Sequence, residues 1–177
     1  MKTQSKNVQY LTLGAMIAAA YTVLTLLAAA LNLAYGEVQF RFSEALTILP
    51  VFTPAAIPGL ALGCLLSNLW SGFGVADMVF GTLATLLAAI ATRMLRNIRV
   101  KGLPVLAPLP PVLFNAVIIG FEIAFLSPGG FIWPAFWGAA LSVGLGEFAV
   151  CYLLGLPFAA ALGSVIRRSE FLSNLFH

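Results

Sequence analysis

Acidic residues inside apolar segments are the strongest chemical signal in this 177-residue sequence. Glu122 lies in IIGFEIAFL, Glu147 lies in GLGEFAVCYLL, and Asp77 follows a glycine-rich turn. A carboxylate in an apolar, water-poor environment costs a few kcal/mol unless protein or water pairs with it. Carboxylates accept N–H hydrogen bonds and bind cations. We therefore expect these three residues to line a polar ligand site; the alternative is that they are solvated at a surface.

Other polar side chains are spaced so that they can join these carboxylates. Asn115 comes seven residues before Glu122 and so shares its helical face. Asn68 lies near the end of another expected helix. Arg41 and Glu44 are three residues apart at the start of a further helix, where they can form a local ion pair. All of them are candidate ligand-binding residues.

Two tryptophans, Trp133 and Trp137, are expected at the same end of the molecule. They could stack on a flat ligand, and we include them among the candidates. Anchoring at the boundary between membrane and water is the alternative that we favour.

Catalytic and metal-binding patterns are missing from the sequence. The only histidine is His177, and no Ser/His, Asp/Asp, HExxH or GxxxxGK[ST] pattern occurs. Cys64 and Cys151 lie in apolar runs without CxxC spacing. We therefore expect no catalytic residue, no metal site, no cofactor and no hydrolysis of ATP by this chain. The Lys and Arg residues form no basic stripe, so nucleic acid is not an expected partner.

The composition places these residues in a membrane. Hydrophobic residues make up 61% of the chain and charged residues 8%, with a mean hydropathy of +1.01. A soluble domain has about 25% charged residues. We expect an all-α integral membrane protein with a single membrane domain, residues 1–177, and six transmembrane helices at about 10–33, 43–56, 58–70, 78–95, 105–126 and 133–166. Pro50, Pro54 and Pro58 divide residues 43–70 into two helices.

The distribution of charge gives the orientation. With six helices and a cytoplasmic N-terminus, eight of the nine Lys and Arg residues are cytoplasmic and Arg41 alone is outside. A five-helix arrangement would still place seven inside, so this count only favours six. Both termini are then cytoplasmic. Counting ~1.5 Å per helical residue puts Asp77, Glu122 and Glu147 near the outer edge of the membrane core, with Glu37 and Glu44 in the first outer loop.

The first helix carries small residues at the spacing that allows close helix approach. Gly14 and Ala18, Ala15 and Ala19, and Ala18 and Thr22 are each four residues apart. Packing within this protein explains the spacing as well as a docking surface for a partner does. No internal repeat is visible, which disfavours a stand-alone alternating-access transporter.

Several segments together resemble a known family. They are GEVQFRFSEALTILPVF (residues 36–52), the following PGLALGCLLSN, FNAVIIGFE and GEFAVCYLLGLP. The sequence resembles the QueT family of substrate-binding S-components of energy-coupling factor (ECF) transporters. The resemblance implies a six-helix S-component-like bundle in the cell membrane of a prokaryote. It also implies partnership with a transmembrane coupling protein (EcfT) and two cytoplasmic ATPases, with the Ala-rich face of the first helix docking on the coupling protein.

The resemblance further implies high-affinity binding of a micronutrient, a precursor of queuosine such as preQ0, preQ1 or queuine. We expect Glu122 and Glu147 to accept hydrogen bonds from the N–H edge of the base or from its amine, with Asn115 beside them. Cobalamin or another vitamin is an alternative ligand. A stand-alone small secondary transporter or channel is the alternative from another class.

Overall fold

Helices are the main secondary structure of the residues that the computed structural model describes, 2–34, 40–72 and 74–176. The order is α1 (Lys2–Ala30), the 3-10 helix η1 (Phe42–Val51), α2 (Ala56–Ser67), the short 3-10 helix η2 (Asn68–Trp70), α3 (Val75–Met94), α4 (Leu109–Phe125), α5 (Trp133–Phe148), the π-helix η3 (Ala149–Gly155), α6 (Leu156–Arg168) and α7 (Glu170–Phe176). These ranges contain no strand beyond one isolated bridge, between Val100 and Leu103. The expected all-α class is confirmed.

Three helical stretches of the described residues are long and apolar enough to cross a membrane: Lys6–Ala30, Val75–Met94 and Trp133–Arg168. Three further apolar helices are shorter, at Phe42–Val51, Ala56–Trp70 and Leu109–Phe125. Prolines explain much of this shortness, because a proline inside a helix removes a hydrogen bond and a proline at its start fixes the first turn. Pro50 lies in the last turn of η1, and α4 begins at Leu109 instead of at 105, after Pro104 and Pro108.

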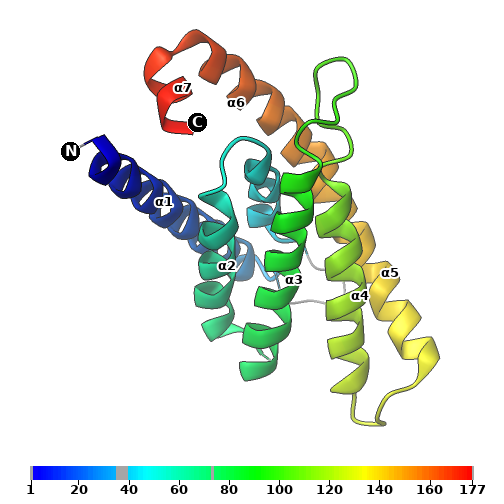
Figure 1. Cartoon of the computed structure of the whole chain (residues 1–177). Helices are drawn as coiled ribbons and strands as arrows, with labels where there is room; N and C mark the ends of the chain where they lie inside the picture. The colour runs from blue at the N-terminus through cyan, green and yellow to red at the C-terminus, as the bar shows by residue number, and fades with distance from the viewer. Residues whose placement is uncertain (1, 35–39, 73, 177) are drawn as a thin grey trace.

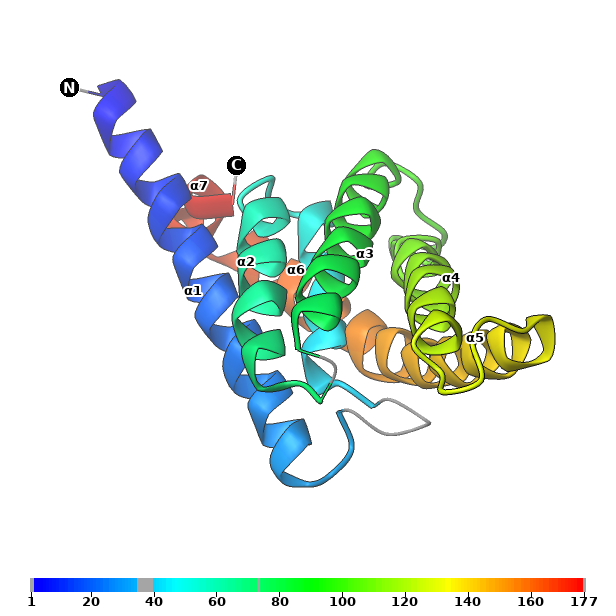
Figure 2. The ribbon, with the colours of Figure 1, turned by 90° about the horizontal axis from the view of Figure 1, so that it is seen from below.

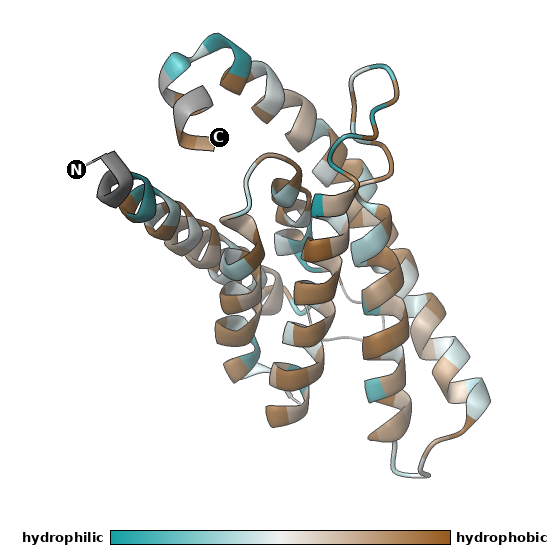
Figure 3. Ribbon diagram, viewed as in Figure 1, coloured by the Kyte–Doolittle hydropathy of each residue, from teal (hydrophilic) through white to brown (hydrophobic). Residues whose placement is uncertain are grey.

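The helices form a bundle in which α2, α3 and α4 lie side by side and α5–η3–α6 crosses obliquely as one continuous element (Figure 1). The end of α2, the start of α3 and the loop 126–132 lie at the lower end of Figure 1, and the loop 95–108 lies at the upper end. Figure 2 shows the same helices from below, with the start of α1 and the helix α7 again on one side of the molecule. Hydrophobic residues cover the helices, while hydrophilic residues gather at the start of α1, the end of α6 and the loop after α3 (Figure 3).

Glycines bring α1 and α2 into close contact. A Cβ atom at Gly59 would lie 2.7 Å from the carbonyl oxygen of Gly14, and one at Gly63 would lie 2.8 Å from that of Ala18. The hydroxyl of Thr22 donates a 3.2 Å hydrogen bond to the carbonyl oxygen of Gly63. Small residues therefore let the two backbones touch, which is the main source of helix association where lipid surrounds the protein.

The segment η1 is a ten-residue 3-10 helix, although the sequence predicts an ordinary helix there. Such long 3-10 runs are uncommon because their hydrogen-bond geometry is poorer. Side chains compensate: the Thr47 hydroxyl donates a 2.6 Å bond to the carbonyl oxygen of Glu44, and Arg93 of α3 donates a 2.9 Å bond to that of Pro50. The backbone of η1 thus receives one hydrogen bond from a side chain of its own and one from a residue distant in sequence.

Candidate ligand-binding site

Seven polar residues from five segments of the chain are buried together in the bundle, each no more than 5% exposed. They come from the start of η1, the end of α2, the first turn of α3, the length of α4 and the end of α5. We call them the polar cluster: Arg41, Glu44, Asn68, Asp77, Asn115, Glu122 and Glu147. All seven are residues that the sequence analysis selects as ligand-binding candidates.

Arg41 is the cation of the polar cluster. Its guanidinium acts electrostatically on Glu44 and Asp77, and also on Glu122 and Glu147. The Nε atom of Arg41 also donates a 3.2 Å hydrogen bond to the carbonyl oxygen of Ala34. One buried cation therefore attracts four buried carboxyl groups.

Two of the four carboxyl groups receive hydrogen bonds from side chains outside the polar cluster. The Tyr21 hydroxyl of α1 donates to Oε1 of Glu44. The Cys151 thiol lies 3.6 Å from Oε2 of Glu147, one turn earlier on the same helix, and 3.6 Å from the carbonyl oxygen of Glu44. Glu44 and Glu147 are therefore held in position by the protein itself.

The start of α3 is held by Asn68. Its side-chain amide donates a 2.8 Å hydrogen bond to the carbonyl oxygen of Asp77 and lies 3.5 Å from the sulfur of Cys64. This close approach depends on Gly81, because a Cβ atom there would lie 2.5 Å from Nδ2 of Asn68. The contact places Asp77 beside Glu122, whose carboxyl group it affects electrostatically.

Polar atoms on α4 are left for a ligand. Within the described part of the chain, neither carboxyl oxygen of Glu122 makes a well-formed hydrogen bond, and the same holds for Nδ2 of Asn115. Asp77 lies beside the first group and Glu147 beside the second. Glu122 is 0% exposed. Leaving such a group unpaired costs about 1–3 kcal/mol, and more for a charged group. These three polar atoms are thus buried among polar neighbours without a well-formed hydrogen bond of their own to a described residue.

The two candidate tryptophans are exposed, whereas the polar cluster is buried. Trp133 and Trp137 are 64% and 59% exposed and pack edge-on against Phe136, with ring centroids 5.9 Å and 4.9 Å away. Trp133 also lines an apolar groove of about 510 Å³ with side chains of α3 and α4. These exposed positions favour membrane anchoring over stacking on a ligand.

The small residues of α1 divide between two faces. Gly14 and Ala18 are buried against α2, and Thr22 is half-buried there. Ala15 and Ala19 are exposed on the other face. Gly14, Ala18 and Thr22 therefore pack within the bundle. Of these five small residues, only Ala15 and Ala19 are exposed.

Sequence reasoning missed Tyr21 and Cys151 as neighbours of the site. A tyrosine in the middle of an apolar helix is a usable signal, because its buried hydroxyl needs a partner. Cys151 follows Glu147 by four residues and so shares its face, which was a second signal. Glu37, expected in the first outer loop, lies outside the described residues.

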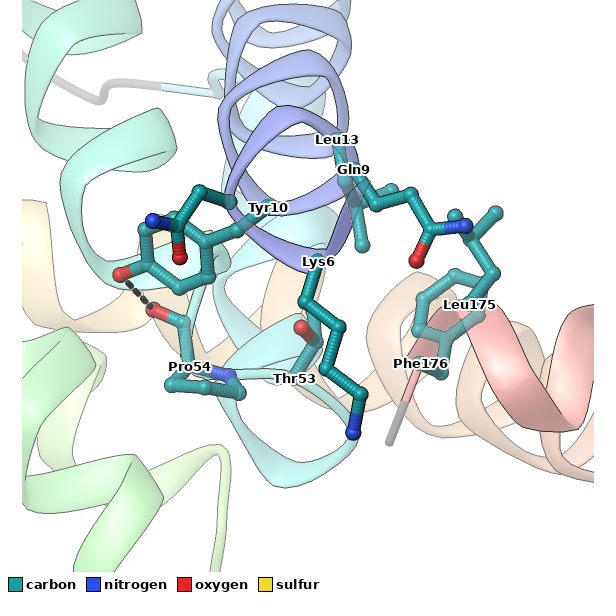
Figure 4. Close-up of a pocket in the computed structure, with 9 residues that line it drawn as sticks. Lys6, Gln9, Tyr10, Leu13, Thr53, Pro54, Leu175 and Phe176 are labelled. Atoms are coloured by element: carbon teal, nitrogen blue, oxygen red, sulfur yellow. Dashed lines mark hydrogen bonds between the residues drawn. The ribbon is translucent and has the colours of Figure 1, made fainter. Parts of the chain in front are cut away.

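A separate cavity of about 240 Å³ lies between the first turns of α1 and the end of α7 (Figure 4). Lys6, Gln9 and Tyr10 approach it from α1, and the Tyr10 hydroxyl donates a 3.4 Å hydrogen bond to the carbonyl oxygen of Pro54. Leu175 and Phe176 line its opposite side (Figure 4). No member of the polar cluster lines this cavity.

The chemistry of the polar cluster suits an organic ligand with N–H groups. Carboxylate oxygens accept hydrogen bonds or attract a cation, and an amide nitrogen donates to an acceptor. No group of three or more His, Cys, Asp and Glu among the described residues is arranged to hold a metal ion. The fold and this interior define a class: an all-α membrane protein with a buried polar centre.

Comparison with known proteins narrows the class to a family. A model of the QueT transporter family matches residues 11–164, and the chain belongs to this family. The resemblance seen in the sequence is thereby confirmed. Over 83 residues the chain is 36% identical to a protein of Lactococcus lactis subsp. cremoris (strain MG1363) described as "Queuosine precursor transporter QueT". The match covers 47% of this chain and 48% of that protein, so the chain spans about half the length of the curated relative. No solved structure matches.

Proposed function

We propose that this protein is the membrane-embedded substrate-binding subunit, or S-component, of an energy-coupling factor importer, and that it binds a precursor of queuosine. Membership of the QueT transporter family and the name of the Lactococcus relative support the substrate class. The observation that carries the proposal is a pair of groups on α4 that are buried without a well-formed hydrogen bond to a described residue, the Glu122 carboxyl group and the Asn115 amide nitrogen. A stand-alone channel has no need for such a closed, partly unpaired polar centre.

The polar cluster matches the hydrogen-bonding edge of a deazaguanine base. Such a base presents adjacent N–H donors, which one carboxylate accepts in parallel, and a carbonyl acceptor, which an amide N–H satisfies. Glu122 and Glu147 supply the carboxylates and Asn115 supplies the amide. Arg41 and Glu44 fix the charge around them, and Asn68 and Asp77 complete the site from α2 and α3.

Ligand entry requires the bundle to open, because every member of the polar cluster is buried. The segment η1 is suited to move, since it is a long 3-10 helix that depends on contacts with α3 and η3. Closure over a small base removes water from the carboxylates and strengthens their hydrogen bonds. High affinity for a small ligand follows from this enclosure.

The proposal places the protein in the cell membrane of a prokaryote, with both termini in the cytoplasm. Transport then requires a transmembrane coupling protein and two cytoplasmic ATPases, because this chain has no nucleotide-binding motif. The exposed face of α1 with Ala15 and Ala19 is the proposed docking surface for the coupling protein. Close approach of a partner helix is possible there because both side chains are small.

Mass spectrometry of the small molecule that copurifies with the protein, followed by calorimetry with preQ1, queuine, preQ0 and cobalamin, tests the ligand. We expect a deazaguanine to copurify and to bind tightly. Cobalamin as the only ligand would overturn the substrate assignment. Transport by this chain alone in proteoliposomes, without coupling protein and ATPases, would overturn the S-component assignment.

A further inference from the structure

The number of buried negative groups in the polar cluster exceeds what one cation can balance. The titratable and charged groups that face one another there come from every element packed around it: Tyr21 on α1, Arg41 before η1, Glu44 on η1, Cys64 on α2, Asp77 on α3, Glu122 on α4, Glu147 on α5 and Cys151 on η3. Four ionised carboxylates around Arg41 would leave a net charge of −3 in a buried interior. Unbalanced charge of this size is too costly, so protons remain on some carboxyl groups.

Hydrogen bonding separates the carboxyl groups into two kinds. Glu44 accepts from Tyr21, and Glu147 has the Cys151 thiol beside it. Glu122 instead stands beside another acid, Asp77, which acts on it electrostatically and lies within hydrogen-bonding reach, although no well-formed hydrogen bond joins the two among the described residues. Two adjacent buried carboxyl groups share one proton more readily than they ionise together.

Helix position decides which acid of the pair holds the proton. Asp77 lies in the first turn of α3, where the positive end of the helix dipole stabilises an anion. Glu122 lies in the last turn of α4, which ends at Phe125, where the negative end of the dipole opposes one. The proton therefore resides on Glu122.

We propose that Asp77 and Glu122 form a subsite that exchanges a proton for the ammonium group of the ligand. The Glu122 carboxylic acid gives its proton to the solvent as the pocket opens, and the ammonium group takes its place between the two carboxylates. The charge of the polar cluster is the same before and after the exchange. This inference rests on the proposed function and selects, within it, an aminomethyl base such as preQ1 over the amine-free preQ0.

Calorimetry at one pH near neutrality, in buffers that differ in ionisation enthalpy, counts the protons released on binding. We expect about one proton released per preQ1 bound and about none for preQ0. The affinity for preQ1 should fall by up to about tenfold per pH unit as the pH decreases, because protonated Glu122 competes with the ammonium group, while preQ0 should show no such trend.

Two variants and a control test the residues. Glu122→Gln and Asp77→Asn should each reduce proton release with preQ1 to about zero and weaken preQ1 at least about tenfold relative to preQ0. Glu170→Gln, at an exposed position on α7, should keep the wild-type release. Binding of preQ1 without proton release by the wild type would overturn the exchange and leave the proposed function standing. Failure of both bases to bind would overturn the proposed function itself, and the exchange with it.

Discussion

The side-chain amide of Asn68, at the end of α2, donates a 2.8 Å hydrogen bond to the main-chain carbonyl oxygen of Asp77, in the first turn of α3. The bond closes the turn between two helices that lie side by side (Figure 1). It also fixes the backbone that presents the Asp77 carboxyl group to Glu122. Asp77 therefore has two roles: its carbonyl oxygen accepts the hydrogen bond that joins the two helices, and its carboxyl group acts electrostatically on Glu122.

Replacing Gly81 by alanine should break this relationship. The new Cβ atom would lie 2.5 Å from Nδ2 of Asn68 and displace the buried amide from its acceptor. We expect a loss of about 1–3 kcal/mol in stability, the cost of unpaired buried polar groups, and a lower thermal unfolding midpoint in detergent. Gly138→Ala is the matched control, because no atom lies within 4 Å of its added Cβ. Equal midpoints for the two variants would show that Asn68 moves without cost.

Arg41→Ala should weaken ligand binding at least about tenfold, which corresponds to about 1.4 kcal/mol. An exposed ion pair with Glu44 would contribute under about 1 kcal/mol, but Arg41 is buried and acts on four carboxyl groups. Calorimetry with preQ1 measures the change. Arg168→Ala, which removes an exposed cation at the end of α6, should leave affinity unchanged. If Arg41→Ala binds preQ1 as tightly as the wild type does, Arg41 has no role in ligand binding and acts only at the start of η1.

Glu147→Gln and Glu122→Gln should each weaken preQ1 by roughly 2–5 kcal/mol, because each change leaves donors of an enclosed ligand unpaired. Glu37→Gln should have little effect, because a carboxylate in a loop is expected to be screened by water. Isothermal titration of the three variants decides between them. If the first two bind as tightly as the wild type, the contact assignment is wrong.

Ala19→Leu should separate transport from binding. Ala19 is exposed on α1, so a larger side chain leaves the bundle intact while it blocks close approach of a partner helix. We expect unchanged ligand affinity and at least about tenfold less complex with the coupling protein in copurification. Ala161→Leu, at an exposed position on α6, is the control. Normal assembly of the Ala19 variant would move the docking surface elsewhere.

Both termini should be inaccessible from outside the cell. The expected orientation rests on the six-helix arrangement, which places eight of the nine cations on the cytoplasmic side. Single cysteines introduced beside Lys2 and beside His177 should react with an impermeant reagent only after lysis. Reaction of either site in intact cells would overturn the orientation.

The sequence predicts the helices and the membership of the polar cluster because both follow from local rules. Apolar runs and prolines mark the helices, and a carboxylate such as Glu122 in an apolar run has to find partners in the interior. The helix types of η1 and η3 could not be predicted in this way. They depend on contacts between distant residues, such as Arg93 with Pro50 and Cys151 with Glu44.

The face that α1 turns inward was also beyond sequence reasoning. Gly14 with Ala18 and Ala15 with Ala19 have identical spacing, and only the positions of Gly59 and Gly63 on α2 select the first pair. For the tryptophans, the sequence left two interpretations, and their exposure depends on how α5 packs against the rest of the bundle.

The π-helix η3 sets how far α5 is rotated about the helix axis relative to α6 in the continuous element α5–η3–α6. A π segment accommodates one residue more than an α-helix over the same rise, and each α-helical residue turns the helix by about 100°. Deleting a single residue within Ala149–Gly155 would restore the α-helical ladder and swing Trp133–Phe148 about a third of a turn relative to α6. Glu147 would then leave Glu44 and face lipid. Glu147 thus faces the site because η3 contains one residue more than an α-helix of the same length would.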